Sequence, residues 1–246
     1  MPVFFIPPEC IRQQAISVTG DVLVHLRDSL RIKVGEMVLF GDGTSRRYRT
    51  EISAVTTQAL TARIIEAITQ SAPRAPTLTL GQALLKGEKM DWVIQKATEL
   101  GVSEIVPLQT SHSVVQLKAD RVDHQLARWQ RIAFEAAQQS EQWRVPTIAP
   151  PRSLATLLAN RTTSTVTLML AERQEGKSLQ TVNLPQDATG SMLVLIGPEG
   201  GWSKEEMLVA EQAGIQSITL GQQILRADTA AIATVSILQS RLGELG

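Results

Sequence analysis

The sequence is poor in residues that several classes of protein depend on. Cys10 is the only cysteine in 246 residues, so no disulfide can form within the chain, and we expect a reducing, cytoplasmic environment. The 24 Lys and Arg residues balance 24 Asp and Glu residues, so no overall positive charge points to a nucleic-acid partner. No apolar run approaches the roughly 20 residues of a membrane span. We therefore expect neither a disulfide scaffold nor a membrane segment.

Signals for metal binding and for targeting are also missing. His25, His112 and His124 are the only histidines, and with one cysteine they show no metal-ligand spacing. The first ten residues, MPVFFIPPEC, lack the basic start and long apolar core of a signal peptide. Hydrophobic residues make up 43% of the chain and charged residues 20%, which is typical of a globular protein. We expect no bound metal and no signal peptide.

The first part of the chain is rich in short segments that favour β-strands. These segments cover residues 21–26, 36–40, 49–52 and 59–65. Gly41-Asp42-Gly43 between the second and third segments predicts a hairpin. Strands at this spacing indicate a small β-barrel over residues 1–72. The proline-punctuated stretch Ser71-Ala72-Pro73-Arg74-Ala75-Pro76 then predicts a boundary between domains.

From residue 77 to residue 246 strand-like and helix-like segments alternate. We expect strands over 78–84, 104–106, 166–170, 192–196 and 218–220, and helices over 90–100, 120–140, 153–160, 204–213 and 228–242. Trp92 and Trp129 fall at the helical spacing of core residues, so we expect both to pack in the interior. Alternation of this kind predicts an α/β domain with a mainly parallel sheet.

Residues 195–206, LIGPEGGWSKEE, leave a strand through a glycine-rich loop and start a helix. Ser203 and Glu206 have the spacing of a capping box, so the helix should begin near Lys204. Three glycines in five residues allow a ligand to approach the backbone closely. Pro198 removes an N–H donor and Glu199 adds a negative charge, so a phosphate is disfavoured and a neutral heterocycle or a cation is favoured. The alternative is a tight turn without a ligand.

In parallel sheets ligands bind at the carboxyl ends of the strands. Three such ends stand out, at residues 170–172, 196–201 and 220–226. The third places Arg226 just before Asp228, which is expected to cap the last helix. Pairing of Arg226 with Asp228 for structural reasons is the alternative to a functional role. The last helix also carries apolar residues over more than one stripe, which favours a homodimer interface: Ala231, Ile232, Val235, Ile237 and Leu238.

Several motifs together resemble the 16S ribosomal RNA (uracil-N3) methyltransferases of the SPOUT superfamily. They are GQALLKGEKMDWVIQKATELGVSEIVP (81–107), EAAQQS (135–140), LIGPEGGWSKEE (195–206) and LGQQILRADTA (220–230). The resemblance runs through the whole C-terminal half in the same order. In the N-terminal half, His25-Leu26, Ser29-Leu30-Arg31 and Gly35-Glu36 resemble the PUA-like RNA-binding barrel of that family, and the match is weaker.

The resemblance implies a fold and a cofactor. It implies a deep trefoil knot in the C-terminal domain, a homodimer, and S-adenosylmethionine held in the knot. The residues that it places around the cofactor lie on the three strand ends and on the start of the last helix: Leu170, Glu172, Ile196, Gly197, Pro198, Glu199, Gly200, Gly201, Leu220, Gly221, Ile224, Leu225, Thr229 and Ala230. Trp202, beside the glycine loop, is expected to cover the cofactor.

The resemblance also implies that RNA is the partner, in the small ribosomal subunit. The expected RNA contacts are Arg27, Arg31, Lys33, Arg46, Arg47, Arg49, Lys86, Lys89, His112 and Arg144. A solvated polar face is the alternative for the cluster in the small domain, and helix capping is the alternative for Lys86 and Lys89. Three positions depart from the family: Val3 and Gln142 stand where many members carry arginine, and His112-Ser113 replaces Arg-Ser. The departures suggest that this chain contacts RNA through other residues than many members of the family do.

The activity that follows is N3-methylation of a uridine in the decoding region of 16S rRNA. Arg226 is the candidate catalytic residue, because a cation beside the uracil carbonyls stabilises a developing imide anion. The proton acceptor for N3 stays open among Glu199, Asp228 and water. Two alternatives remain: a SPOUT methyltransferase that acts on another base or on a ribose 2′-hydroxyl, and a non-catalytic RNA-binding assembly factor with the same fold.

Overall fold

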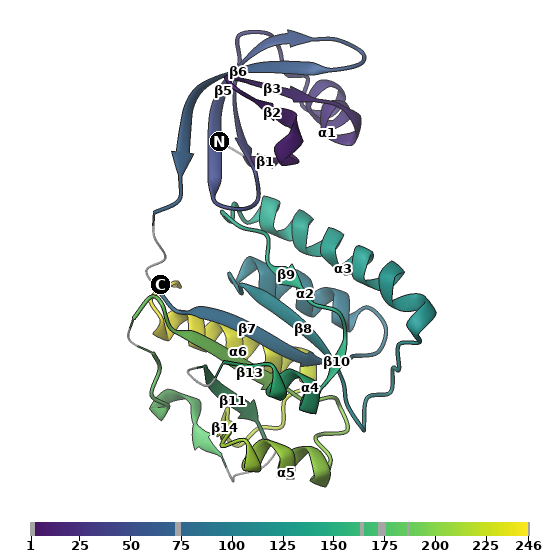
Figure 1. Cartoon of the computed structure of the whole chain (residues 1–246), viewed down its shortest axis with the longest axis vertical. Coiled ribbons are helices and arrows are strands. Elements are labelled where there is room, and N and C mark those ends of the chain that lie inside the picture. The colour runs from purple at the N-terminus through teal and green to yellow at the C-terminus, as the bar shows by residue number, and fades with distance from the viewer. Residues whose placement is uncertain (1–2, 72–74, 163–164, 172–175, 186, 246) are drawn as a thin grey trace. The chain divides into compact units, whose positions relative to one another are not determined.

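The computed structural model of the chain describes residues 3–71, 75–162, 165–171, 176–185 and 187–245. The chain divides into two compact units (Figure 1). The first unit comprises Met1–Ala72 together with Ala137–Val145, and the second comprises Pro73–Ala136 together with Pro146–Gly246. The chain therefore returns to the first unit after it has begun the second.

The first unit contains a six-stranded sheet in the order β1-β4-β5-β6-β3-β2. Its strands are β1 (Val3–Phe5), β2 (Ile11–Arg12), β3 (Ala15–Val18), β4 (Met37–Gly41), β5 (Arg46–Val55) and β6 (Leu60–Thr69). β4 and β5 form the predicted hairpin around Gly43, which has a φ of +68°. β1 and β2 end this path and do not pair with each other in the described residues. The sheet is therefore open, and a closed PUA-like barrel is not confirmed.

The strand predicted over residues 21–26 is wrong, because the chain is helical there. α1 (Gly20–Val24) runs directly into the helical turn η2 (His25–Ser29), and η1 (Pro8–Cys10) precedes them. Leu23 and Leu26, three residues apart, are buried, whereas Val24 between them is 48% exposed. Burial at a spacing of three is the pattern of a helix rather than of a strand. Leu23 and Leu26 pack in the core of the sheet with Phe4, Phe40 and Ile52.

The segment from Ala137 to Val145 belongs to the first unit through specific contacts. The backbone N–H of Phe5 donates to Oε1 of Gln138 at 2.9 Å, and the N–H of Val145 donates to the carbonyl of Gly43 at 2.9 Å. The guanidinium of Arg47 lies 4.0 Å from the ring centre of Trp143. No motif in the sequence indicates this return of the chain, because each contact joins residues far apart along it.

The second unit is built on a sheet in which every strand pairing is parallel. The strand order is β10-β8-β7-β13-β11-β14-β12, and β9 pairs with β8. The strands are β7 (Thr77–Ala83), β8 (Glu104–Gln109), β9 (Thr147–Ile148), β10 (Arg152–Ser153), β11 (Val166–Leu170), β12 (Lys177–Ser178), β13 (Ser191–Ile196) and β14 (Gln216–Thr219). This confirms the predicted α/β class with a mainly parallel sheet.

Both faces of the sheet in the second unit are covered. Leu193 and Leu195 of β13 pack with residues of α4 (Leu154–Ala159) and α5 (Lys204–Gln212). Met192, Val194 and Ile196, which alternate with them and point to the other face, are also buried. Gly81 of β7 has no room for a side chain, since a Cβ there would lie 2.7 Å from Leu195. The continuous apolar run of β13 is therefore that of a strand buried on both faces, as predicted.

The remaining helices are α2 (Lys89–Glu99), α3 (Ala119–Gln139), α6 (Ala227–Arg241) and the turn η3 (Leu179–Thr181). Figure 1 shows α6 lying along one face of the sheet. Ala231, Val235 and Leu238 of α6 are fully buried, and Nε2 of Gln239 donates to the carbonyl of Leu100 at the end of α2. These contacts hold α6 against α2 and place its first residues at the carboxyl ends of the strands.

Candidate functional site

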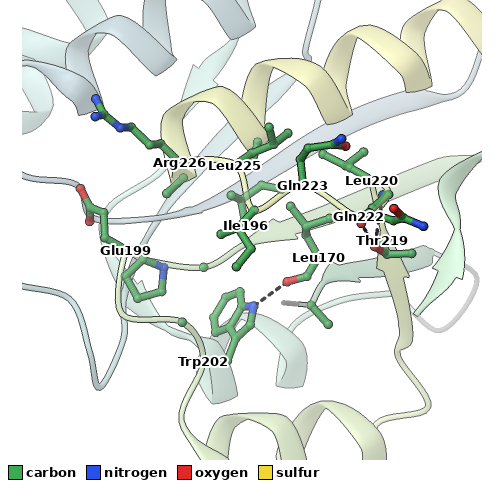
Figure 2. Close-up of a pocket in the computed structure, with 18 residues that line it drawn as sticks. Leu170, Ile196, Glu199, Trp202, Thr219, Leu220, Gln222, Gln223, Leu225 and Arg226 are labelled. Atoms are coloured by element: carbon green, nitrogen blue, oxygen red, sulfur yellow. Dashed lines mark hydrogen bonds between the residues drawn. The ribbon is translucent and has the colours of Figure 1, made fainter. Parts of the chain in front are cut away.

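A pocket of about 550 Å³ lies at the carboxyl ends of β11, β13 and β14, beside the first turn of α6. β11 pairs with β13 on one side and with β14 on the other, so the loops that follow these strands meet. The pocket is lined by Leu170, Ala171, Ile196, Gly197, Pro198, Glu199, Gly201, Trp202, Thr219, Leu220, Gly221, Gln222, Gln223, Ile224, Leu225, Arg226, Ala227 and Ala230. Figure 2 shows these lining residues. The volume of the pocket lies in the range of sites that bind small molecules.

The glycine loop, residues 197–201, connects β13 to α5. The N–H of Gly201 donates to the carbonyl of Pro198 at 3.0 Å, and the φ of Gly201 is +71°, which favours glycine. Ser203 and Glu206 then form the predicted capping box, in which each side chain accepts from the other residue's backbone N–H. The loop thus turns tightly and ends at a rigid helix start.

Trp202 fixes the glycine loop to the neighbouring strand. Its indole Nε1 donates to the carbonyl of Leu170 at 3.0 Å, as Figure 2 shows. A Cβ on Gly197 would lie 3.1 Å from the indole, so the ring lies tightly against the loop backbone. Trp202 therefore lines the pocket, as the sequence suggested, and it also ties together two of the three strand ends.

His112 fixes the glycine loop from another direction. Its Nδ1 lies 3.1 Å from the carbonyl oxygens of both Gly200 and Gly201, and because carbonyls only accept, Nδ1 carries the proton. The N–H of Ser111 donates to Oε1 of Glu206 at 2.9 Å. A Cβ on Gly200 would lie 3.0 Å from Cβ of His112, so a larger residue at position 200 has no room. The ring of His112 thus holds the glycine loop, and the predicted contact of this exposed residue with RNA stays a prediction.

Glu199 and Arg226 are the two charged residues that line the pocket among the residues described. Figure 2 shows both side chains at the same end of the pocket. Oε1 of Glu199 accepts a hydrogen bond from Nζ of Lys89, the first residue of α2, at 2.9 Å. Arg226 makes no side-chain hydrogen bond or ion pair with any residue that the structure describes. The pocket therefore offers one carboxylate held by a lysine and one free guanidinium.

The other pocket walls combine apolar side chains with the neutral polar side chains of Thr219, Gln222 and Gln223. Leu170, Ile196 and Leu220 line the interior, and Ile196 is fully buried at the end of β13. Ile224 and Leu225, on the loop that precedes α6, are 70% and 37% exposed. Apolar side chains with this exposure at a pocket mouth suit a flat, apolar ligand surface. The site thus combines an apolar wall with a small number of charged groups at one end.

Most of the residues expected around a cofactor meet in this pocket. Twelve of the predicted site residues line it: Leu170, Ile196, Gly197, Pro198, Glu199, Gly201, Leu220, Gly221, Ile224, Leu225, Arg226 and Ala230. Gly200 and Thr229 are not part of the lining, and Glu172 lies outside the described residues. Ala171, Gln222 and Gln223 lie in the strand ends that the sequence singled out but were not named as site residues, and Thr219 and Ala227 lie next to those ends.

One expectation about the start of the last helix is wrong, and the alternative offered for Arg226 is not supported. Asp228 does not cap α6, because the helix begins at Ala227 and Arg226 occupies the N-cap position. Arg226 also forms no ion pair with Asp228, whose Oδ1 is buried without a hydrogen-bond partner among the described residues. Asp228 does not line the pocket. The structural explanation for Arg226 is therefore not supported.

The predicted RNA contacts fall into two groups. Four are exposed and make no side-chain ion pair with described residues: Arg31, Lys33, Arg46 and Lys86. The others have partners within the protein: Arg27 pairs with Asp28, Arg49 with Glu66 and Lys89 with Glu199, Arg47 bonds to the carbonyl of Glu141, and Arg144 bonds to Gln70.

Trp92, expected in the core, is 42% exposed, whereas Trp129 is buried as predicted.

The tip of the β4–β5 hairpin, which carries Arg46 and Arg47, is organised by Asp42. Its Oδ1 accepts hydrogen bonds from the backbone N–H groups of Thr44, Ser45 and Arg46 at 2.8, 3.1 and 3.0 Å. Burial opposes ionisation of this carboxyl, but the three donors outweigh burial and lower the pKa of Asp42. The carboxylate therefore fixes the backbone from which the two arginines project.

Among the described residues, no group of three or more His, Cys, Asp or Glu side chains is arranged to hold a metal ion. In the same part of the chain, no helix has the length and apolar character needed to span a membrane.

Comparison with known proteins places the chain in a family. A family model described as an RNA methyltransferase domain matches residues 72–239. The ribosomal RNA small subunit methyltransferase E of Synechocystis sp. is 31% identical over 247 residues, covering 95% of this chain and 75% of the relative.

Solved structures agree with this placement. The crystal structure of a ribosomal RNA small subunit methyltransferase E from Neisseria gonorrhoeae bound to S-adenosyl methionine has a TM-score of 0.86 at 29% identity and covers 98% of both chains. A putative methyltransferase from Legionella pneumophila, in complex with the same cofactor, has a TM-score of 0.85 at 26% identity and covers 97% of both. The chain therefore belongs to the RNA methyltransferase family that includes the ribosomal RNA small subunit methyltransferases E.

Proposed function

We propose that the protein transfers a methyl group from S-adenosylmethionine to N3 of a uridine in the decoding region of 16S rRNA, in the small ribosomal subunit. One observation supports this proposal above the others. The pocket at the carboxyl ends of β11, β13 and β14 brings Glu199 and Arg226 together at one end, beside apolar and neutral polar side chains. This is the arrangement that a cationic cofactor and an anion-forming base require together.

The residues of the pocket fit S-adenosylmethionine. Leu170, Ile196 and Leu225 provide an apolar surface suited to an adenine ring. Backbone groups of the glycine loop are accessible to the ligand, and Pro198 and Glu199 make the loop unsuitable for a phosphate. The carboxylate of Glu199 suits the positive charge of a sulfonium. When bound, the cofactor supplies an electrophilic methyl group.

The protein would contribute orientation and electrostatic stabilisation. The glycine loop is fixed by Trp202 and His112, so the ligand is held against a rigid wall. Alignment of the attacking nitrogen with the methyl carbon can supply much of the rate enhancement. Arg226 is free of partners among the described residues and would stabilise negative charge that develops on the uracil carbonyl oxygens. Arg226 is therefore our candidate catalytic residue.

The first unit would bind the RNA, as a PUA-like module. Phosphate contacts dominate the affinity of such complexes, and exposed cations without protein partners suit them best. In the first unit Arg31, Lys33 and Arg46 meet this description, and Lys86 meets it in the second unit. We further propose a SPOUT trefoil knot around the pocket and activity in the cytoplasm. We also propose a homodimer that uses the half-buried Ile232 and Ile237 of α6, because Ala231, Val235 and Leu238 are buried within the chain itself.

The test is methyl transfer to purified small ribosomal subunits that lack the native methylation. Subunits are incubated with the protein and with S-adenosylmethionine labelled in the methyl group, and label in 16S rRNA is measured. We expect label in one nucleotide, at N3 of a uridine. Label on another base or on a ribose 2′-hydroxyl would favour a different methyltransferase. Binding to the subunit with no transfer would favour a non-catalytic assembly factor.

A further inference from the structure

The N3–H proton of the uridine needs an acceptor. The residues that line the pocket limit which side chains can be that acceptor. Of the lining residues described, only Glu199 has a side chain with a basic group, its carboxylate, that can accept a proton. Asp228, the other acidic candidate, does not line the pocket. His112 is not among the lining residues either.

The turn of the glycine loop is closed without the side chain of Glu199. The turn is closed by a backbone hydrogen bond from Gly201 to Pro198, and the next helix is capped by Ser203 and Glu206. Oε1 of Glu199 bonds to Nζ of Lys89, and Oε2 has no hydrogen-bond partner among the residues that the structure describes. One carboxylate oxygen is therefore held and the other is available.

The position of Lys89 has no evident stabilising purpose. As the first residue of α2 it places a positive charge at the positive end of the helix dipole, which is unfavourable. The side chains of Lys89 and Glu199 are 35% and 32% exposed, and ion pairs of this exposure contribute little to stability. Lys89 does, however, orient the carboxylate of Glu199 through the hydrogen bond from Nζ to Oε1.

We propose that Glu199 is the proton acceptor for uridine N3 and that Lys89 is the residue that positions it; this inference rests on the function proposed above. The N3–H bond breaks and its proton moves to Oε2 of Glu199. The nitrogen electron pair forms the bond to the methyl carbon, and the carbon–sulfur bond breaks with its electron pair left on sulfur. The carboxylate and the sulfonium are thus neutralised in the same step. Glu199 then releases the proton to water.

Arg226 and Glu199 would act on the same base in different ways. The guanidinium of Arg226 stabilises the charge on the carbonyl oxygens while the N3–H bond weakens. The carboxylate of Glu199 removes the proton. Placing the two at one end of the pocket, on loops that follow different strands, allows both to reach a single uracil ring.

The experiment compares the wild-type protein with Glu199→Gln, which keeps the shape of the side chain and removes the acceptor. The measurements are the single-turnover methylation rate from pH 6 to pH 9, and the affinities for S-adenosylmethionine and S-adenosylhomocysteine by calorimetry. We expect the neutral-pH rate to fall about 10²–10⁴-fold. The defect should shrink as pH rises, because N3 then loses its proton without help. Affinity for the neutral S-adenosylhomocysteine should stay within about threefold of wild type.

The matched control is Glu211→Gln, an exposed glutamate on α5 outside the pocket, which should behave as wild type. In the wild-type background, Lys89→Gln should lower the single-turnover rate by roughly tenfold. In the Glu199→Gln background it should cause no further loss, because the effects of coupled residues are non-additive. Parallel loss of rate and of S-adenosylhomocysteine affinity in Glu199→Gln would overturn the proposal in favour of a structural role. A rate defect that is constant with pH, or no defect, would also overturn it. Failure of the proposed function is distinct, since the wild-type protein would then not methylate N3.

Discussion

Trp202 and Leu170 are joined by a hydrogen bond of 3.0 Å from the indole Nε1 to the backbone carbonyl oxygen. The two residues lie at the carboxyl ends of different strands, since Leu170 ends β11 and Trp202 follows β13. The side chain of Trp202 thus connects two walls of the pocket. This relationship gives the first of four predictions about the site and the hairpin.

Replacing Trp202 by Phe should weaken cofactor binding without disrupting the fold. The ring still fills the space beside Gly197, but the hydrogen bond to Leu170 is lost. Loss of such a bond costs about 1 kcal/mol, or about fivefold in Kd. Calorimetry with S-adenosylmethionine measures the change. Trp92→Phe, at an exposed indole on α2, is the matched control and should leave Kd unchanged. Equal affinity for wild type and Trp202→Phe would show that the bond does not position the loop.

Gly197→Ala should also weaken binding, through the same indole. The added Cβ would lie 3.1 Å from Trp202, and crowding of this kind typically costs about 1–3 kcal/mol. In a Trp202→Leu background the smaller side chain leaves room, so the added cost of the alanine should largely disappear. A double-mutant cycle on the Kd of S-adenosylmethionine tests this. A cost that is the same in both backgrounds would show that another contact excludes the methyl group.

Arg226→Ala should lower the rate of methyl transfer and leave the cofactor affinity nearly unchanged. Loss of one preorganised donor at a developing charge costs about 10²–10³ in kcat. Because Arg226 has no ion pair with Asp228, the free energy of unfolding should not change. Arg226→Lys keeps the charge but loses the planar fork, so partial activity indicates that charge alone is needed. Wild-type rates in both variants would remove Arg226 from the mechanism.

Asp42→Asn should destabilise the first unit in a pH-dependent way. The pKa of Asp42 is lowered in the folded state, so its ionised form contributes stability above the unfolded value of about 3.9. That contribution is lost as pH falls through the lower folded-state pKa. Urea unfolding of wild type and variant should therefore differ at pH 7 and converge in acid. Asp123→Asn, on the exposed face of α3, is the control. A difference that persists in acid would contradict the role of the carboxylate.

The local parts of the site follow from the sequence. The apolar run of β13, the glycine loop and the capping box of Ser203 and Glu206 are adjacent in the chain, and each has its own pattern. The rule that ligands bind at the carboxyl ends of parallel strands then brings Leu170, Ile196 and Leu220 to one place. These residues were predictable because short-range patterns and one topological rule were sufficient.

The contacts that were missed join distant residues or override a local pattern. Lys89 and Glu199 are 110 residues apart in sequence, and no periodicity connects them. His112 departs from the family pattern, yet it holds the glycine loop through a side-chain contact that no motif encodes. The segment 21–26 has the composition of a strand, but burial of Leu23 and Leu26 against the sheet makes it helical. Tertiary packing decided each of these cases.

The most direct measurement identifies the methylated nucleotide. Small subunits that lack the native methylation are treated with the protein and S-adenosylmethionine, and the 16S rRNA is digested and analysed by mass spectrometry. The account predicts one new N3-methyluridine, located in the decoding region, and its absence when Arg226→Ala replaces the wild-type protein in a single-turnover assay. A methyl group on a different base or on a ribose 2′-hydroxyl, or no methylation by wild type, would contradict the account.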